Sequence, residues 1–208
     1  MFERIGYSHV MKTRTLIAIV TVVLASLAQA DMPAKTNKVM GTPVAAITVE
    51  VFSDFQCPHC KALHETWMEP LIRNYVMTGK VQLIQHEFPL TQHPFARTAA
   101  NYAVAADRVG KYGEVCDILF KKQDDWGKDG KVDQTACSVL NAAEAKKVRE
   151  LVKDPAVLSQ VQKDIDAGIQ AKLQRTPTVI VTYKGKHYNA DVGATYASFA
   201  RFLDSLAH

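Results

Sequence analysis

The stretch FSDFQCPHCK, residues 52–61, decides how this chain folds and where its chemistry lies. It joins an apolar, β-branched run (residues 45–55) to a pattern of helical spacing that starts at Pro58. The run predicts a buried strand. The pattern after it predicts a helix with proline at its first position, where the missing N–H costs nothing. Cys57 and Cys60 are therefore expected on the first turn of a helix that directly follows a strand.

A helix N-terminus carries unpaired N–H groups and a partial positive charge, which favour a thiolate over a thiol. Because the thiolate is the reactive species, Cys57 is expected to attack and Cys60, one turn further in, to resolve. Pro58 removes one N–H and stiffens the turn, and His59 adds a positive charge or an N–H donor near the Cys57 sulfur. Each unit by which the pKa falls is worth ~1.4 kcal/mol, or about 30 mV for a two-electron couple. The motif thus predicts an oxidising disulfide.

Two other uses of a cysteine pair are disfavoured. A structural zinc site needs four ligands, and Cys116 and Cys137 are single and distant from the pair. A disulfide between positions three residues apart closes a very small loop and constrains the unfolded chain little, so an inert staple gains little stability. We therefore expect a redox-active pair and no metal.

Residues 11–30, MKTRTLIAIVTVVLASLAQA, are typical of a secretory signal peptide. Lys12 and Arg14 precede an apolar run, and AQA ending at Ala30 is a small-x-small cleavage site. The apolar run is too short for a typical membrane-spanning helix of ~20 residues. Residues 1–30 are thus expected to be leader and signal peptide, with translation starting at Met11 and cleavage after Ala30.

Export changes the meaning of the cysteines, because an oxidising compartment lets disulfides form and persist. The net charge of the full chain is +4. Removal of residues 1–30 takes away three basic residues and one acidic residue, which leaves +2. This charge is mild and its basic residues are scattered, so neither nucleic acid nor a membrane surface is an expected partner.

The rest of the chain predicts an α/β domain with a helical block in its middle. Residues 80–90 read as a second strand, residues 91–174 contain only helical patterns, and Asp154 with Pro155 marks the start of the last helix of this block. A hairpin and a final helix close the chain at residues 178–183, 187–192 and 196–207. The order is strand–helix–strand, helical block, hairpin, helix.

The motif in residues 52–61, this order of elements and the later RTPTVIV (residues 175–181) together resemble the DsbA-like thiol:disulfide oxidoreductases of the thioredoxin superfamily. The resemblance covers residues 42–206. It implies a thioredoxin-like fold built from residues 42–90 and 175–208, with residues 91–174 as an inserted helical domain. It also implies that Pro177 is cis and faces the cysteine pair, and that Thr176 offers backbone groups to a bound peptide in a flat, apolar groove near His59.

One departure from the family pattern concerns a buried acid. Many members carry an acidic residue six positions before the first cysteine, under the active site, as a proton acceptor. That position is Val51 here, and Glu50 stands one residue earlier. A shift of one residue turns a strand side chain to the other face, so Glu50 transfers protons only if a bulge restores its direction. Asp54 is nearer to the cysteines and is expected to be a surface or capping group.

Cys116 and Cys137 are expected to form a structural disulfide between two helices of the insertion. In the chain-entropy model this bond would contribute ~3 kcal/mol. A second redox relay and two free buried thiols are the alternatives.

These observations predict a periplasmic oxidase that donates the Cys57–Cys60 disulfide to unfolded or reduced exported proteins, with no cofactor besides that disulfide. The resemblance implies reoxidation by a DsbB-like membrane partner. A monomer is expected, because about 14 residues between Asp31 and the first strand leave no room for an N-terminal dimerisation domain. A reductase or isomerase is the first alternative, since Thr176 before Pro177 is also seen in those branches. A non-redox peptide-binding chaperone is the second.

Overall fold

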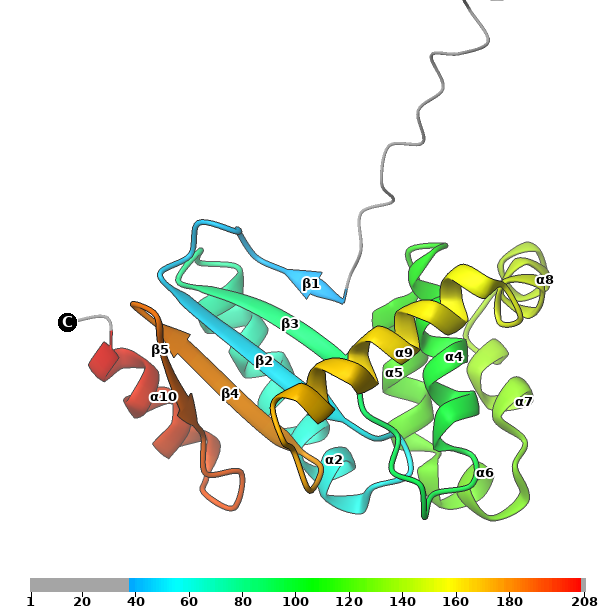
Figure 1. Cartoon of the computed structure of the whole chain (residues 1–208). Coiled ribbons are helices and arrows are strands. Elements are labelled where there is room, and N and C mark those ends of the chain that lie inside the picture. Colours follow the sequence, from blue (N-terminus) through cyan, green and yellow to red (C-terminus); the bar gives the residue numbers. More distant parts are fainter. Residues whose placement is uncertain (1–37, 207–208) are drawn as a thin grey trace, which may run out of the picture. The chain divides into compact units, whose positions relative to one another are not determined.

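A five-stranded mixed sheet lies at the centre of the region that the computed structural model describes, residues 38–206 (Figure 1). The strands are β1 (Val39–Met40), β2 (Ile47–Ser53), β3 (Val81–Glu87), β4 (Thr178–Tyr183) and β5 (Lys186–Asn189). Their order across the sheet is β1-β3-β2-β4-β5. Only β2 and β3 run parallel among these neighbours. The predicted leader and signal peptide lie outside the described residues.

The strand that leads into the cysteine motif is the middle strand of the sheet. Residues of β2 pair with β3 on one side and with β4 on the other without interruption. Successive side chains of a strand point to opposite faces, so Val49, Val51 and Ser53 share one face and Glu50 and Phe52 share the other. This alternation determines which side chains lie beneath the cysteines.

The predicted helix after β2 is present, but two of its turns are wide. It consists of α2 (Pro58–Leu63), a π-helical turn η1 (His64–Met68), α3 (Glu69–Leu71) and a second π-helical turn η2 (Ile72–Val76). The π-helical turns lie before and after Pro70, which has no N–H to bond to the preceding turn. Gly79 follows with φ of 77°, a conformation that glycine adopts without steric cost.

The helix after β2 and the last helix, α10 (Tyr196–Leu206), share one hydrophobic core with the sheet. Val49 and Val51 of β2 belong to it, as do Trp67 and Phe199, whose rings stack with centroids 4.6 Å apart. The predicted final helix is present, and Phe199 and Leu203 lie on its buried side.

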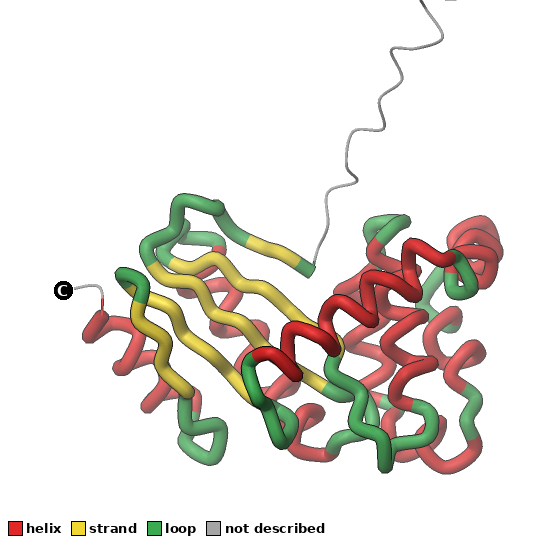
Figure 2. Tube along the Cα trace, in the orientation of Figure 1, coloured by secondary structure: helices red, strands yellow, loops and turns green. Residues whose placement is uncertain are grey.

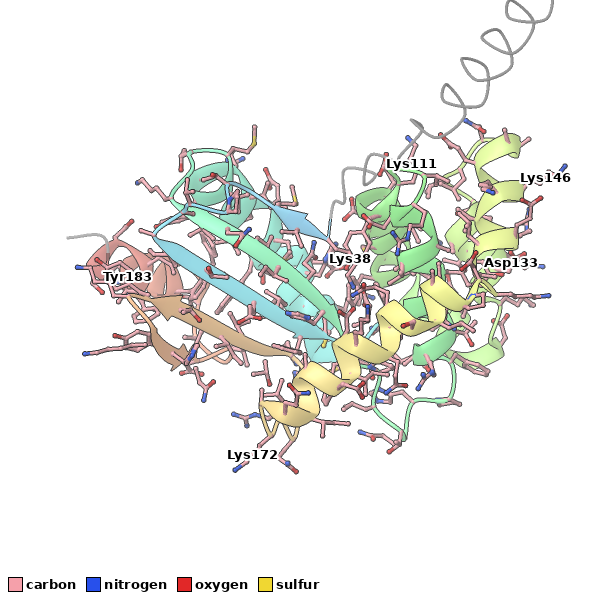
Figure 3. The ribbon with its side chains drawn as sticks, turned by 45° about the horizontal axis from the view of Figure 1, so that its top comes forward. Lys38, Lys111, Asp133, Lys146, Lys172 and Tyr183 are labelled. Carbon is pink, nitrogen blue, oxygen red and sulfur yellow. The ribbon has the colours of Figure 1, made fainter. Side chains whose placement is uncertain are left out.

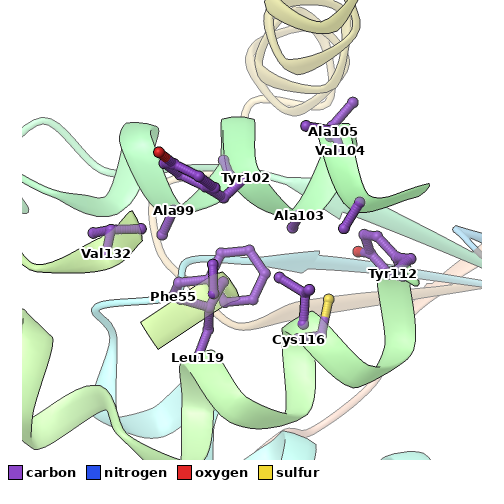
Figure 4. Packing of buried hydrophobic residues seen from close by; sticks show 14 of the residues in the cluster. Phe55, Ala99, Tyr102, Ala103, Val104, Ala105, Tyr112, Cys116, Leu119 and Val132 are labelled. Carbon is purple, nitrogen blue, oxygen red and sulfur yellow. The ribbon is translucent and has the colours of Figure 1, made fainter. Parts of the chain in front are cut away.

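The stretch between β3 and β4 contains the helices α4 (Ala96–Asp107), α5 (Tyr112–Lys121), α6 (Gln123–Asp129), α7 (Val132–Cys137), α8 (Ala142–Leu151) and α9 (Pro155–Gln170) (Figure 2). They form a second core, in which α4 and α5 pack face to face through alanine, valine and aromatic side chains (Figure 4). The predicted start of α9 is confirmed: Asp154 Oδ1 accepts a hydrogen bond from Ala156 N (2.7 Å). Across the described residues no helix has both the length and the apolarity to cross a membrane.

Two details of the strands differ from the sequence-based expectations. The predicted hairpin is present and turns at Lys184 and Gly185, both with positive φ. The first difference is its second strand, β5, which begins one residue earlier and ends three residues earlier than predicted. The second difference is β1, which is absent from the predicted order of elements and pairs with β3 through Val39 and Met40. A strand of two residues leaves no alternating pattern of apolar and polar residues in the sequence. β1 is therefore recognised only by its pairing with β3.

The burial of α10 predicts the cost of truncating its side chains. Replacement of the fully buried Leu203 by alanine should lower the free energy of unfolding by about 2–5 kcal/mol, because it leaves a cavity against the sheet. Leu206 lies on the same helix and is only partly buried, so L206A is the matched control with a smaller loss. Urea unfolding of both variants measures this difference, and equal losses would contradict the assigned packing.

Candidate functional site

The two motif cysteines lie on a tight turn from β2 into α2. Cys57 is the N-cap of α2 in an extended conformation, and Pro58 follows it at the first helical position. Cys57 N donates to Asp54 O, and Cys60 N and Lys61 N both donate to Cys57 O, each at 3.1 Å. Cys57 is 5% exposed and Cys60 is fully buried. The turn therefore presents the Cys57 sulfur toward the surface and holds the Cys60 sulfur inside.

Asp54 anchors this turn. Its buried carboxylate accepts hydrogen bonds from Gln56 N (2.7 Å) and Leu90 N (2.7 Å) and lies 2.8 Å from His93 Nδ1. Its own backbone N–H donates to Cys60 Sγ (3.3 Å). Asp54 therefore connects the motif to the loop after β3. Of the two roles expected from the sequence, the surface role is wrong, because Asp54 is buried, and its carboxylate instead accepts backbone N–H groups as a capping group does. The Asp-x-Gln spacing, typical of a side chain that bonds the backbone two residues on, was the local signal for this role.

A second anchor comes from the helical stretch. Gln123, buried at the start of α6, donates from Nε2 to Phe55 O (2.6 Å) and to Cys57 O (3.0 Å). No pattern in the sequence indicated this contact, because 66 residues separate Gln123 from Cys57. The helices between β3 and β4 therefore contribute directly to the shape of the cysteine turn.

The environment of Cys57 favours its thiolate. A hydrogen bond from the Cys60 thiol is the main cause that lowers the pKa of Cys57 to about 5, against the opposing effect of burial. The Thr176 side chain and the backbone N–H groups of Cys60 and His59 lower this pKa further. The Thr176 hydroxyl is buried and has no other hydrogen-bond partner among the described residues, so it is available to donate to the thiolate. The His59 side chain is exposed beside this site, and its backbone contributes the donor.

Cys60 has the opposite character. Burial, first, and then its hydrogen bond to Cys57 and the negative charge there raise the pKa of Cys60 far above its usual value. Cys60 therefore holds its proton while Cys57 is ionised. The division predicted from the sequence, in which Cys57 attacks and Cys60 resolves, stays a prediction.

The loop before β4 lies next to Cys57. The peptide bond between Thr176 and Pro177 is cis, and the Cys57 thiol donates to Thr176 O (3.4 Å). A groove of about 390 Å³ opens here. Its lining residues come from α2, from η1, from the cis-proline loop and from the segment before α10: His59, Ala62, Leu63, Thr66, Trp67, Arg175, Thr176, Pro177, Asp191, Val192, Gly193 and Ala194. The groove is more polar than the flat, apolar surface expected from the sequence, because Arg175, Asp191 and Thr66 contribute to it.

Glu50 does not lie under the cysteines. It sits on β2 in uninterrupted register with Ile84 and Ile180, so the bulge that would turn it toward Cys60 is absent at this position of β2. Its carboxylate instead bonds His86 Nε2 (3.1 Å), and this hydrogen bond lowers the pKa of Glu50. The proton-transfer role considered for Glu50 therefore has no geometric basis here.

A different acid occupies the buried side of the site. Glu87, 2% exposed at the end of β3, accepts hydrogen bonds at Oε1 from Tyr112 Oη (2.7 Å) and Lys38 Nζ (3.4 Å). Lys38, which is labelled in Figure 3, also bonds the buried Asp164 of α9. Side chains from a strand, a loop and a helix therefore form one ionic cluster. Burial is the main cause that raises the pKa of Glu87. The sequence gave no sign of this cluster, because its members are far apart in the chain.

The predicted disulfide between Cys116 and Cys137 is not present in this structure, in which all four cysteines are free thiols. Their surroundings differ. Cys116 lies on α5 one turn from Tyr112 (Figure 4), and burial raises its pKa well above the usual value. Cys137 donates to Asp133 Oδ1 (3.5 Å), and burial raises its pKa to about 11. Both are therefore protonated, unreactive thiols at neutral pH. Across residues 38–206 no cluster of three or more His, Cys, Asp or Glu side chains could hold a metal ion.

The unequal acidity of the two motif thiols predicts a specific pH profile. Alkylation of the reduced protein by iodoacetamide should rise with pH around a midpoint of about 5 and should modify Cys57 alone. In C60A the midpoint should move upward, because the main hydrogen bond to the thiolate is lost. C137A is the matched control and should keep the midpoint near 5. A midpoint near 9 in the unmodified chain would contradict the assigned environment of Cys57.

Comparison with known protein families gives a consistent result. A family model described as thioredoxin matches residues 33–205. The chain is 26% identical over 160 residues to disulfide bond formation protein D of Bacillus subtilis, which covers 72% of this chain and 69% of that protein. It is also 29% identical over 175 residues to Na(+)/H(+) antiporter NhaA 3 of Salinispora tropica, covering 79% of this chain. The chain spans about a quarter of that antiporter, since 25% of it is covered.

Solved structures with a similar fold include alpha-DsbA1 of Wolbachia pipientis, with a TM-score of 0.68 and 20% identity over 81% of this chain and 89% of that one. Oxidised BdbD of Bacillus subtilis has a TM-score of 0.63 and 24% identity over 81% of this chain and 91% of that one. At these identities the likeness establishes the fold, and the expected thioredoxin-like α/β fold is confirmed. With the family match over residues 33–205, it follows that the chain belongs to the thioredoxin family.

Proposed function

We propose that this protein is a thiol:disulfide oxidoreductase that works as an oxidase and donates the Cys57–Cys60 disulfide to exported proteins. The observation that carries this proposal is the environment of Cys57, which lowers its pKa to about 5 while Cys60 stays protonated. A stabilised thiolate favours the reduced form of the pair, and a couple whose reduced form is favoured oxidises other thiols. The match to a relative named disulfide bond formation protein D supports the same role.

The reaction would run in two exchanges. A substrate thiolate attacks Cys57 Sγ, the Cys57–Cys60 bond breaks, and Cys60 leaves with the electron pair and takes up a proton. The substrate is then joined to Cys57 as a mixed disulfide. A second substrate thiolate attacks the substrate sulfur of this bond, and Cys57 leaves as the stabilised thiolate. The substrate has lost two electrons and now contains a disulfide. Cys57 and Cys60 have gained the two electrons and are reduced.

The groove beside Cys57 is the proposed place for the substrate peptide. It contains Thr176 and Pro177 on one side and His59 on the other. Its polar and charged lining suits an unfolded chain, whose backbone groups need hydrogen-bond partners. A peptide held there would bring its own cysteine next to the exposed edge of Cys57.

The proposed location is the periplasm, with export directed by the predicted signal peptide of residues 11–30 and a monomer as the active species. The reduced Cys57–Cys60 pair must be reoxidised, and a DsbB-like membrane oxidase is the proposed partner. No other cofactor is required, because the cysteine pair itself takes up the two electrons when its disulfide is reduced.

The function is tested with an unfolded, reduced protein that forms several disulfides. The oxidised protein should speed its refolding, and C57S should abolish this effect. C60S should also fail to speed refolding, because without Cys60 the chain cannot form the disulfide that it would donate. C137S, altered far from the pair on α7, should keep full activity.

Three results would overturn the proposal. A glutathione equilibrium that places the pair among cytosolic reductants, together with insulin reduction, would indicate a reductase. Reshuffling of wrongly paired disulfides without net oxidation would indicate an isomerase. Full activity of C57S would indicate a chaperone that uses the groove alone.

A further inference from the structure

A small cavity lies behind Cys60, on the inner side of the site. Its volume is about 20 Å³, which is room for one water molecule. Cys60 reaches it from α2, Glu87 from β3, and Tyr112 and Cys116 from α5. The substrate groove lies on the other side of α2 and shares only Leu63 with this cavity. The cavity is therefore a separate compartment that contains the buried thiol and a buried acid.

The buried position of Cys60 creates a chemical requirement. Opening of the disulfide expels Cys60 as a thiolate, and this sulfur is fully buried. Burial disfavours the charged form strongly, which is why the pKa of Cys60 lies far above its usual value. The departing sulfur must therefore receive a proton from a group inside the protein, and the reverse step must return that proton.

The other groups around the cavity are poorly suited to exchange this proton. The pKa values of Tyr112 and Cys116 are raised far above their usual range by burial, so both groups hold their protons. His86 directs its two ring nitrogens at Glu50 (3.1 Å) and Asp164 (3.4 Å). His64 Nε2 is paired with Asp117 Oδ1 (2.8 Å) at the protein surface.

Glu87 has the required properties. Both of its hydrogen bonds, from Tyr112 and Lys38, fall on Oε1, which leaves Oε2 to carry a proton. Burial and the negative charge of Asp164 raise its pKa, and Lys38 and Tyr112 oppose this rise. A carboxyl group that is subject to these opposing effects can both hold and release a proton, as a general acid and base must.

The sheet register explains how this acid reaches Cys60 although Val51 is apolar. Val51 is paired with Gln85 of the parallel strand β3, and Ser53 is paired with Glu87. Glu87 therefore lies on the same face of the sheet as Val51. It stands beside Ser53, the next residue of β2 on that face toward the cysteine turn. Glu87 lies on β3, whereas the family pattern places the acid on the strand before the cysteines. A search at a fixed distance before Cys57 therefore misses Glu87.

We propose that Glu87 exchanges the proton of Cys60 across this cavity, directly or through one water molecule. When a substrate thiolate opens the disulfide, Glu87 gives its proton to the Cys60 sulfur and becomes a carboxylate. When Cys60 attacks a mixed disulfide on Cys57, Glu87 takes the proton back, the Cys57–Cys60 bond forms and the substrate sulfur leaves as a thiolate. This inference rests on the proposed exchange through Cys57 and Cys60.

The closing step isolates this proton transfer. Cys57 is loaded as a mixed disulfide with thionitrobenzoate, and attack by Cys60 releases the coloured thiolate. The substitution E87Q should slow this release about tenfold or more at neutral pH, since general base catalysis contributes about 10²–10⁴-fold. It should leave the alkylation midpoint of Cys57 unchanged. E50Q removes a carboxylate from the opposite face of the sheet and is the matched control, which should release the thiolate at the original rate.

A second variant keeps the test decisive if E87Q does not fold. Y112F removes a hydrogen bond that lowers the pKa of Glu87. If the Glu87 carboxylate is the base, the release rate rises as pH passes the pKa of Glu87, and Y112F moves this rise to higher pH. Original rates and pH profiles in folded E87Q or in Y112F would overturn the inference. Failure of the unmodified protein to exchange with any thiol would instead overturn the proposed function.

Discussion

The hydrogen bond from the Cys60 thiol to the Cys57 sulfur is the interaction on which the rest of this site depends. It requires two thiols of unequal burial, one with a small exposed edge and one fully buried, and the turn between β2 and α2 provides both. Burial keeps the proton on Cys60, and that proton stabilises the charge on Cys57. The Asp54 backbone N–H, the Gln123 amide and the loop of Thr176 hold this geometry from three different parts of the chain.

The sequence predicted the parts of this arrangement that are local. A β-branched run, a proline after the first cysteine and a glycine in the later hairpin each specify backbone conformation within a few residues, so the order of elements and the positions of Cys57 and Cys60 could be predicted. The resemblance carried by residues 52–61 and 175–181 then placed Thr176 and Pro177 beside the pair, and the contact of Thr176 with Cys57 agrees with this placement.

The parts that the sequence did not predict are contacts between distant segments. Glu87 reads as an ordinary strand residue until the register places it beside Ser53, on the face that carries Val51. Gln123 and Lys38 look like surface residues in helical and polar stretches, yet both are buried because their partners lie in other elements. Polar side chains whose burial depends on tertiary packing leave no periodic signal, so their roles appear only in the structure.

The central claim, that the protein fold favours the Cys57 thiolate, is tested most directly by comparing the free energy of unfolding of the reduced and oxidised forms from pH 5 to 9. The pKa of Cys57 falls from 9.0 to about 5 on folding, so its contribution is present above the unfolded value and is lost as pH falls through about 5. The oxidised form lacks this contribution. The account predicts that the reduced form gains stability over the oxidised form as pH rises across this window. A difference that does not change with pH, or one that moves in favour of the oxidised form as pH rises, would contradict it.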